Sequence, residues 1–453
     1  MGMLRSGVLG VLPRAAATGF SVAIVCAVAA SPSTAASPTV AWGTTSSAPA
    51  GKLGQLFGVA ATSSTDVLAV GGFNPGQAPT ALLTQPYAEH WNGSSWGATT
   101  VPLRPVYPSG QQTAQLNGVT AIAHGNGWAV GTVSDTSSLA SQTLAYHWNG
   151  IAWKRTVTPD PAGAALSNQL SAVAARAAND VWAVGGDGNY PEVSLVLHWN
   201  GSSWQQITVP NIGALSAVTV APGQVWIAGG DQVEQFNGTT WTTLPVLPGG
   251  PIIEGLADTT AGLWAVGRQD VGCGEGGTCT VSYAAVWNGA KWTVTPAGGG
   301  TGLTGVVAAG PQVLATSADK VLSLTLTGAE SQVTPAIDGQ LTGIATDPTG
   351  NSWAVGSMIT QAGITEPAII NAPGIGQGGI TVTTGAAGAT VTWTGPVNGA
   401  GTTDESGQFA VGGLPAGSYT IIASLPNCQP GVANAQINAG YATAVNAPIS
   451  CPP

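Results

Sequence analysis

Three histidines recur in one motif that combines an imidazole, an amide and two indoles within seven residues. An imidazole titrates near neutral pH and can act as a general base or a metal ligand. The motif has five copies, of which the last two lack the histidine: HWNGSSW at 90–96, HWNGIAW at 147–153, HWNGSSW at 198–204, QFNGTTW at 235–241 and VWNGAKW at 286–292. A position that recurs along the chain cannot converge on one ligand. We therefore expect His90, His147 and His198 to pack in a repeated scaffold, with no catalytic partner from neighbouring repeats.

Carboxylates are the second group that could carry chemistry. A glycosidase needs two of them about 5 to 10 Å apart. The spacing of the acids singles out no pair, and surface solubility is the alternative explanation for them. The acids in predicted loops are Asp187, Glu192, Asp231, Asp270 and Glu275.

Four cysteines lie beyond the N-terminal region, and an even number in an exported chain indicates disulfides. Four cysteines allow three pairings. We expect the two local ones, Cys273–Cys279 and Cys428–Cys451, because the two pairs fall in different predicted domains. A zinc site is not expected, since CxxC spacing is absent from the sequence.

The N-terminus has the parts of a secretory signal peptide. Arg5 and Arg14 flank or precede a short apolar run at 15–30, which small residues follow. The run is shorter than the roughly 20 residues that span a bilayer, so residues 1–36 are predicted to be a cleaved leader rather than a membrane anchor. This places the mature chain outside the cell, secreted or associated with the cell surface, with no membrane span after the leader is removed.

The composition indicates a folded β-rich protein. Only 7% of the 453 residues are charged, yet the chain has 16 Trp, which argues against disorder. Without the two leader arginines, eight Lys and Arg stand against 20 Asp and Glu, a formal charge of −12. No basic run is visible in the sequence, which argues against nucleic acid and anionic membranes as partners.

A second segment precedes each WNG motif, in which a Val- and Trp-rich run ends at glycine, as in VWAVGG at 181–186. It has seven copies, 38 to 60 residues apart. Each copy predicts four short strands, with the NG pair as a two-residue type I′ turn between the third and fourth. Such units predict an all-β fold, a seven-bladed β-propeller at 38–374. VAWGTTSSAP at 40–49 matches a fourth strand, so this N-terminal strand is expected to complete the last blade.

The tryptophans follow the same repeat and are predicted to fill equivalent gaps between blades. Of the 16, only Trp393 lies outside the repeat positions. The structural positions in the third and fourth strands are Trp42, Trp91, Trp96, Trp148, Trp153, Trp199, Trp204, Trp241, Trp287 and Trp292.

These repeats resemble those of kelch-like and galactose-oxidase-like propellers, in which apolar residues precede Gly-Gly and a Trp opens the next strand. VLAVGG followed by HWNGSSW carries the resemblance, which covers Pro38 to Gly374. The copper site of galactose-oxidase-like enzymes needs two histidines and two tyrosines at unrelated positions. His124 is the one histidine outside the repeated position, so that site cannot be assembled and no cofactor is expected.

Loops between the second and third strands of each blade vary most, and such loops host recognition on rigid scaffolds. The loop at 268–282 is glycine-rich and would be pinned by the Cys273–Cys279 bond. We expect ligand contacts from Tyr190, Arg268, Asp270 and Glu275, with simple bracing of the loop as the alternative.

Residues 375–453 form a separate predicted β-sandwich. The segment DESGQFAVGGLPAGSYTI at 404–421 resembles the carboxypeptidase-regulatory-like and Cna-B-like modules, a resemblance that covers Gly379 to Pro448. Some of these modules crosslink a lysine internally, but the last lysine here is Lys320. The resemblance implies a spacer or adhesive stalk, with the Cys428–Cys451 bond as its staple.

The sequence predicts a secreted, monomeric, non-catalytic binding or adhesion protein that recognises an extracellular glycan, wall polymer or protein through propeller rim loops. One alternative is a secreted hydrolase or lyase that acts on a polysaccharide through rim carboxylates. The other is a structural surface component.

Overall fold

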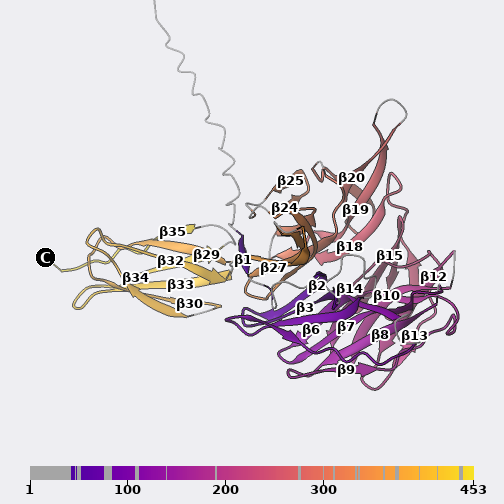
Figure 1. Cartoon of the computed structure of the whole chain (residues 1–453). Coiled ribbons are helices and arrows are strands. Elements are labelled where there is room, and N and C mark those ends of the chain that lie inside the picture. The colour runs from indigo at the N-terminus through magenta and orange to yellow at the C-terminus, as the bar shows by residue number, and fades with distance from the viewer. Residues whose placement is uncertain are drawn as a thin grey trace, which may run out of the picture. The chain divides into compact units, whose positions relative to one another are not determined.

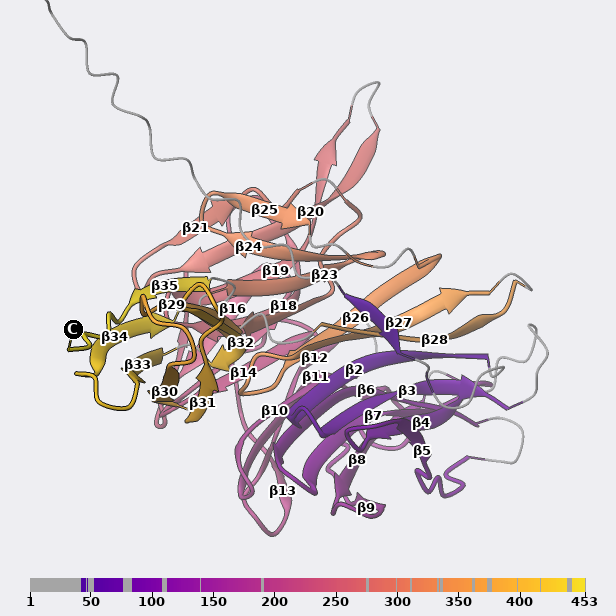
Figure 2. The same cartoon turned by 90° about the vertical axis from the view of Figure 1, so that its left-hand side faces the viewer.

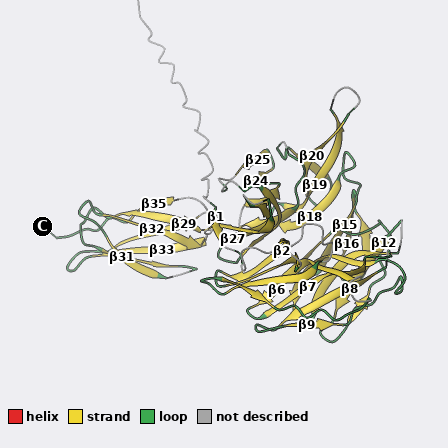
Figure 3. Cartoon of the chain, viewed as in Figure 1, coloured by secondary structure: helices red, strands yellow, loops and turns green. Residues whose placement is uncertain are grey.

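A computed structural model gives the architecture of the chain, which is built of β-strands (Figure 3). The part of the chain that the structure describes contains no helix, and hence none long and apolar enough to cross a membrane. The predicted leader lies outside it. The described residues are 42–45, 47, 53–75, 84–107, 112–138, 140–188, 191–273, 277–298, 300–309, 312–331, 334, 337–360, 363–372, 377–396, 398–415, 417–437 and 442–452.

Seven four-stranded antiparallel sheets account for the repeats (Figure 1). Sheet 1 contains β2 (Leu53–Ser63), β3 (Asp66–Asn74), β4 (Gln85–Trp91) and β5 (Trp96–Thr99). Sheet 2 contains β6 (Gln112–Ala123), β7 (Asn126–Asp135), β8 (Ser141–Trp148) and β9 (Trp153–Thr156). Sheet 3 contains β10 (Asn168–Ala177), β11 (Asp180–Asp187), β12 (Val193–Trp199) and β13 (Trp204–Gln206).

The remaining sheets follow the same strand order. Sheet 4 contains β14 (Ala217–Ala221), β15 (Gln224–Gly229), β16 (Gln232–Phe236) and β17 (Trp241–Thr243). Sheet 5 contains β18 (Ile252–Thr259), β19 (Gly262–Gly272), β20 (Thr278–Trp287) and β21 (Trp292–Thr295). Sheet 6 contains β22 (Gly305–Ala309), β23 (Gln312–Ser317), β24 (Lys320–Thr325) and β25 (Gly328–Ser331). Sheet 7 contains β26 (Gly339–Thr346), β27 (Ser352–Ile359), β28 (Thr365–Ala372) and β1 (Gly43–Thr45).

The glycine that ends each AVG run has a packing reason. A bulge between Leu56 and Gly58 brings β2 close to β3 at Gly71. A Cβ added at Gly71 would lie 1.9 Å from the carbonyl oxygen of Gln55, so a side chain cannot be accommodated there. The equivalent glycines of four other sheets make the same approach, at 1.9 to 2.0 Å: Gly131, Gly185, Gly267 and Gly356.

Several neighbouring sheets pack through a Trp of the second strand and the aromatic pair of the following sheet. The ring centroid of Trp128 in β7 lies 4.7 Å from that of Trp199 and 5.2 Å from that of Trp204, both of sheet 3. Aromatic side chains in such arrangements add to the energy of apolar burial. The same relation joins sheet 3 to sheet 4 (Trp182 with Phe236 and Trp241) and sheet 4 to sheet 5 (Trp226 with Trp287 and Trp292).

The seventh sheet contacts the first in the same way. Trp353 of β27 shares a hydrophobic cluster with Trp91 and Trp96 of sheet 1. The Thr342 hydroxyl of β26 donates a 2.6 Å hydrogen bond to the Leu56 carbonyl of β2. First strands also contact one another in sequence order, from β2 through β6, β10, β14, β18 and β22 to β26.

The first described strand belongs to the last sheet. Strand β1 pairs antiparallel with β28, with Gly43 opposite Asn371 and Thr45 opposite Ile369. Figure 2 shows the indigo β1 lying beside orange strands that come from far along the chain. Trp42, only 5% exposed, extends the contact to Leu314 of sheet 6.

Sheet 5 corrects one expectation about loops. The segment 268–282, predicted to be a glycine-rich loop, is for the most part a continuation of β19 and β20, which pair out to Gly272 and Thr278. Figure 1 shows this hairpin extending beyond its neighbours. The Cys273–Cys279 disulfide joins its two strands, with Cα atoms 5.6 Å apart. The residues on the two sides of this segment pair as antiparallel strands, although the high glycine content had indicated a loop.

The C-terminal module is a two-sheet sandwich. One sheet has the order β32–β29–β35 and the other β31–β30–β33–β34. Its core includes Leu414 and Tyr419, and Trp393 stacks on Phe409 with ring centroids 5.6 Å apart. The strands are β29 (Gln377–Thr383), β30 (Thr390–Thr394), β31 (Gly399–Thr402), β32 (Gln408–Pro415), β33 (Gly417–Ser424), β34 (Gly431–Ile437) and β35 (Ala442–Asn446).

Candidate functional site

The recurring histidines lie at one position in the third strand of sheets 1 to 3, which we call the histidine column (His90, His147 and His198). Each imidazole Nε2 lies within hydrogen-bonding distance of a side-chain oxygen on the first residue of the second strand in the same sheet. The distances are 2.7 Å for His90–Asp66, 2.9 Å for His147–Asn126 and 3.0 Å for His198–Asp180. In sheet 4, the amides of Gln235 and Gln224 make the same link at 3.1 Å.

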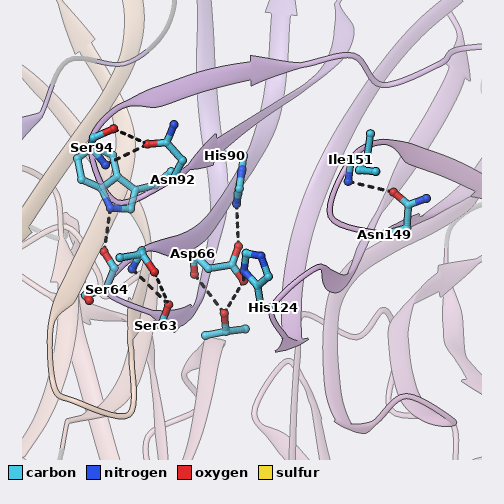
Figure 4. Close-up of polar contacts among 12 residues, drawn as sticks. Ser63, Ser64, Asp66, His90, Asn92, Ser94, His124, Asn149 and Ile151 are labelled. Carbon is cyan, nitrogen blue, oxygen red and sulfur yellow. Dashed lines mark hydrogen bonds and ion pairs between the residues drawn. The ribbon is translucent and has the colours of Figure 1, made fainter.

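The Asp66 carboxylate, the partner of His90, also has a partner from the next sheet (Figure 4). Thr62 donates to it at 2.5 Å, and His124 Nδ1, from the β6–β7 turn of sheet 2, lies 3.2 Å from it. Asp66 is 4% exposed, whereas His124 is 80% exposed. Burial opposes the charged form of Asp66. The hydrogen bonds from Thr62 and His90 and the charges of the two imidazoles outweigh burial and hold the pKa of the carboxyl below its ordinary value.

This arrangement does not match a nucleophile–base–acid relay. In such a relay the imidazole bridges the hydroxyl and the carboxylate. Here both the Thr62 hydroxyl and the His90 imidazole bind the Asp66 carboxylate. Within the described residues, no group of three or more His, Cys, Asp or Glu side chains has the geometry of a metal site. The hydrogen bonds of the column join the second and third strands within each of sheets 1 to 3.

His124 makes a contact between neighbouring sheets that was not predicted from the sequence, to the Asp66 carboxylate rather than to a histidine of the column. It stands outside the repeated position and reaches Asp66 from the next sheet. The repeat pattern contains no signal for this contact, because His124 occupies a turn whose other copies lack histidine.

The hairpin of the WNG motif also differs from the predicted two-residue turn. Trp91 pairs directly with Trp96, so four residues form the connection. Asn92 Oδ1 accepts a 3.0 Å hydrogen bond from the backbone N–H of Ser94 (Figure 4). It accepts a second, also of 3.0 Å, from the backbone N–H of Ser95. Of the motif's turn residues, Gly93 has a positive φ, at 94°, whereas a type I′ turn needs positive φ at two positions. Asn149, Asn200, Asn237 and Asn288 accept the same pair of bonds.

The aromatic residues of the motif form cross-strand pairs, one in each of sheets 1 to 5. Their ring centroids lie 5.8 Å apart for Trp91–Trp96, 5.3 Å for Trp148–Trp153, 5.9 Å for Trp199–Trp204, 5.0 Å for Phe236–Trp241 and 5.5 Å for Trp287–Trp292. Two of these indoles donate to the preceding sheet: Trp153 to the Thr99 hydroxyl at 3.0 Å, and Trp292 to the Pro245 carbonyl at 2.8 Å.

The predicted rim contacts are partly described. Tyr190 and Glu275 lie outside the described residues. The Arg268 guanidinium is paired with Glu254, and Asp270 accepts a 2.7 Å hydrogen bond from Thr280 across the β19–β20 hairpin. Both side chains are therefore engaged within their own sheet.

A small cavity of about 190 Å³ lies where the first strands of all seven sheets meet. Among the described residues that line it, Glu254 is the one carboxylate, and it is the partner of Arg268. The cavity thus lacks the pair of acids that glycoside hydrolysis needs. Small residues from equivalent positions line it: Gly58, Gly118, Ala172, Ala217, Gly255, Gly305 and Gly343.

Two of the predicted loop acids do interact. Asp187 ends β11 and is 6% exposed, and Glu192 accepts a 2.8 Å hydrogen bond from Gln169. Burial, together with the charge of Asp187, raises the pKa of Glu192, and burial raises the pKa of Asp187. Carboxyl pKa values raised chiefly by burial occur at catalytic sites and in buried structural acids alike.

Residues 377–450 match the carboxypeptidase regulatory-like domain family. The C-terminal module is a carboxypeptidase regulatory-like domain. In this domain the Cys428–Cys451 disulfide joins the segment before β34 to the C-terminal residues, beside a bridge between Gln429 and Ser450.

Beyond this regulatory-like domain, the comparisons concern fold alone. No curated protein matches the chain. Among solved structures, the chain is similar to PorZ of Porphyromonas gingivalis, a surface component of the type-IX secretion system of that bacterium. The two share 11% identity at a TM-score of 0.38, over 83% of this chain and 69% of that one.

Proposed function

We propose that the protein is a non-catalytic structural component of an extracellular surface. In this proposal, a closed seven-bladed propeller of kelch-like repeats carries the carboxypeptidase regulatory-like domain. One observation carries this proposal: the repeated aromatic side chains contact the neighbouring sheets, and the repeated imidazoles contact the neighbouring strands. These side chains are therefore occupied in packing.

The cyclic order of sheet contacts supports the propeller. Trp353 packs on the Trp91–Trp96 pair as Trp128 packs on the Trp199–Trp204 pair, so the junction between sheets 7 and 1 repeats an internal junction. β1 completes sheet 7, which leaves the four-strand pattern unbroken. A ring of this kind removes the sheet edges that an open stack exposes.

Three features support a structural role outside the cell. The chain holds two disulfides, and such bonds persist in oxidising compartments. The predicted leader would direct export. The cavity between the first strands is narrow and carries one acid, already paired, rather than a catalytic pair.

The test combines location and activity. Intact producing cells would be treated with a membrane-impermeant biotin reagent, which labels surface proteins, and with a thiol reagent, which detects free cysteines. In a second experiment, the purified chain would be incubated with polysaccharides from the cell wall, and the release of soluble sugar would be measured. We expect surface labelling, cysteines that react after reduction, and no sugar release above the blank. Recovery from the cytosol with free thiols would overturn the location, and sugar release would overturn the structural role.

The interacting acids Asp187 and Glu192 favour a second candidate, hydrolysis of a polysaccharide. If they act as an acid and base pair, Asp187→Asn and Glu192→Gln would each abolish sugar release, whereas Asp231→Asn would not. Recognition of a glycan, wall polymer or protein through Tyr190, Arg268, Asp270 and Glu275 stays a prediction.

A further inference from the structure

A larger cavity lies at the junction of sheets 1 and 2, away from the cavity between the first strands. Its volume is about 620 Å³, and its walls come from the connection after β5 and from β9 with the segment that follows. Strand β9 is the edge strand of sheet 2 and lies at the periphery of the sheets in Figures 1 and 2. Three cationic residues line this cavity, which we call the basic cleft: Arg104, Lys154 and Arg155.

The basic cleft is unusual for this chain. It gathers three of the ten Lys and Arg of a protein whose formal net charge is −10. Elsewhere Arg176 is paired with Asp180 and Arg268 with Glu254. Within the described chain, none of the three cleft cations makes an ion pair. Unpaired like charges that share a cavity attract an anion.

The one carboxylate in the described lining is already engaged. Asp160 accepts hydrogen bonds from the backbone N–H and the hydroxyl of Thr143, at 2.8 and 2.9 Å. The charge of Arg155 also acts on Asp160 and opposes the rise that burial causes in the pKa of that carboxyl, whereas Arg104 and Lys154 are exposed to solvent. The cleft keeps an excess of positive charge that faces outward.

We propose that the basic cleft binds an acidic polysaccharide. The cations would pair with carboxylate or sulfate groups, and the Gln142 amide can hydrogen-bond to sugar hydroxyls. Pro102 and the 89% exposed Val157 present apolar surface to the C–H faces of a sugar ring. The volume falls in the range of cavities that enclose small ligands. This inference depends neither on the propeller nor on the surface location proposed above.

The test measures binding of the purified full chain to immobilised polygalacturonate, dextran sulfate, neutral dextran and poly-glutamate at low and high salt. We expect binding to one or both acidic polysaccharides, weakened by salt, and no binding to dextran. Binding to polygalacturonate alone assigns a carboxylate ligand, and binding to dextran sulfate alone assigns a sulfated one.

A charge-matched pair of variants tests the position of the site. Lys154→Gln/Arg155→Gln should weaken binding about tenfold or more, the effect of losing one charge-assisted hydrogen bond. Lys291→Gln/Lys320→Gln removes two exposed cations elsewhere and should change affinity less than about twofold. Thermal unfolding would verify that both variants fold, and Arg104→Gln provides a further variant outside β9.

Three outcomes would overturn the proposal. One is the absence of binding to either acidic polysaccharide at low salt. Another is equal weakening by the two double variants, which would show attraction without a site. The third is equal affinity for poly-glutamate, which would show that the cleft recognises charge density rather than a sugar.

Discussion

His124 Nδ1 lies 3.2 Å from Asp66 Oδ2, so that the β6–β7 turn of sheet 2 is joined to the first residue of β3 in sheet 1. Asp66 is thereby a junction between two strands of its own sheet and a turn of the next. The contacts between tryptophans of different sheets contain no titratable group, whereas this contact contains a carboxylate and an imidazole. It makes one sheet junction responsive to acid.

Asp66→Asn should reduce the acid sensitivity of folding. The pKa of Asp66 is lowered in the folded state, so its contribution to stability is full above the unfolded pKa of about 3.9 and is lost as pH falls through the lower folded pKa. Urea unfolding at pH 7 and pH 3 measures this. The variant should lose about 2 kcal/mol at pH 7, the range for hydrogen bonds to charged groups, and less at pH 3.

Asp319→Asn is the control, because that carboxylate is exposed in the β23–β24 turn. Its effect should be small and equal at the two pH values. If Asp66→Asn lowers the free energy of unfolding equally at pH 7 and pH 3, then the charge of Asp66 does not stabilise the junction.

Glu234→Leu should raise the free energy of unfolding. Glu234 in β16 is fully buried, and neither carboxylate oxygen has a hydrogen-bond partner in the described chain. Leu197 fills the equivalent position of sheet 3 at 0% exposure. Removal of an unpaired buried acid stabilises by about 1 to 3 kcal/mol, measurable by urea unfolding at pH 7.

Glu89→Leu provides the matched contrast, because the Tyr87 hydroxyl donates to Glu89 at 2.9 Å. This substitution leaves a buried hydroxyl without its acceptor and should destabilise. A destabilised Glu234→Leu variant would mean that Glu234 has a stabilising partner after all.

Gly93→Ala and Gly289→Ala should separate backbone strain from crowding in the WNG turn. Both glycines have a positive φ, 94° and 93°, which costs an alanine about 1 kcal/mol. A Cβ at Gly93 would also lie 2.8 Å from Thr65 Cγ2, whereas Gly289 has no such neighbour within 4 Å. We expect Gly93→Ala to lose about 1 kcal/mol more by thermal unfolding. Equal losses would show that Thr65 moves aside freely.

Loss of the Cys428–Cys451 bond should loosen the carboxypeptidase regulatory-like domain. The bond closes a sequence separation of 23 residues, against 6 for Cys273–Cys279. Chain entropy gives losses of roughly 3 and 2 kcal/mol for the corresponding Cys→Ser double variants. Hydrogen exchange of peptides within 377–450 should accelerate in the first variant and stay unchanged in the second. Unchanged exchange in both would show that the bond does not hold this domain.

The repeat pattern predicted the strands because alternation and glycine spacing are local properties of the chain. The seven four-stranded sheets follow from it, whereas the regulatory-like domain was indicated by the separate segment at 404–421. The contact of His124 with Asp66 and the meeting of Arg104 with Lys154 and Arg155 join different sheets, so no local pattern encodes them. The prediction of a two-residue type I′ turn in the WNG motif was wrong. The Asn92 side chain instead accepts hydrogen bonds from the backbone of a four-residue turn, so the turn does not need two residues with positive φ.

The pairing of β1 with β28 sets the order in which the molecule can be completed. Synthesis delivers Gly43–Thr45 long before Thr365–Ala372, so the fourth strand of sheet 7 must wait for the third. Such a long-range contact forms slowly, because the chain between the two strands loses entropy when they pair. The pairing between the two ends of the repeat region therefore forms late, and its loss would remove the fourth strand of sheet 7 while leaving the other six repeat sheets intact.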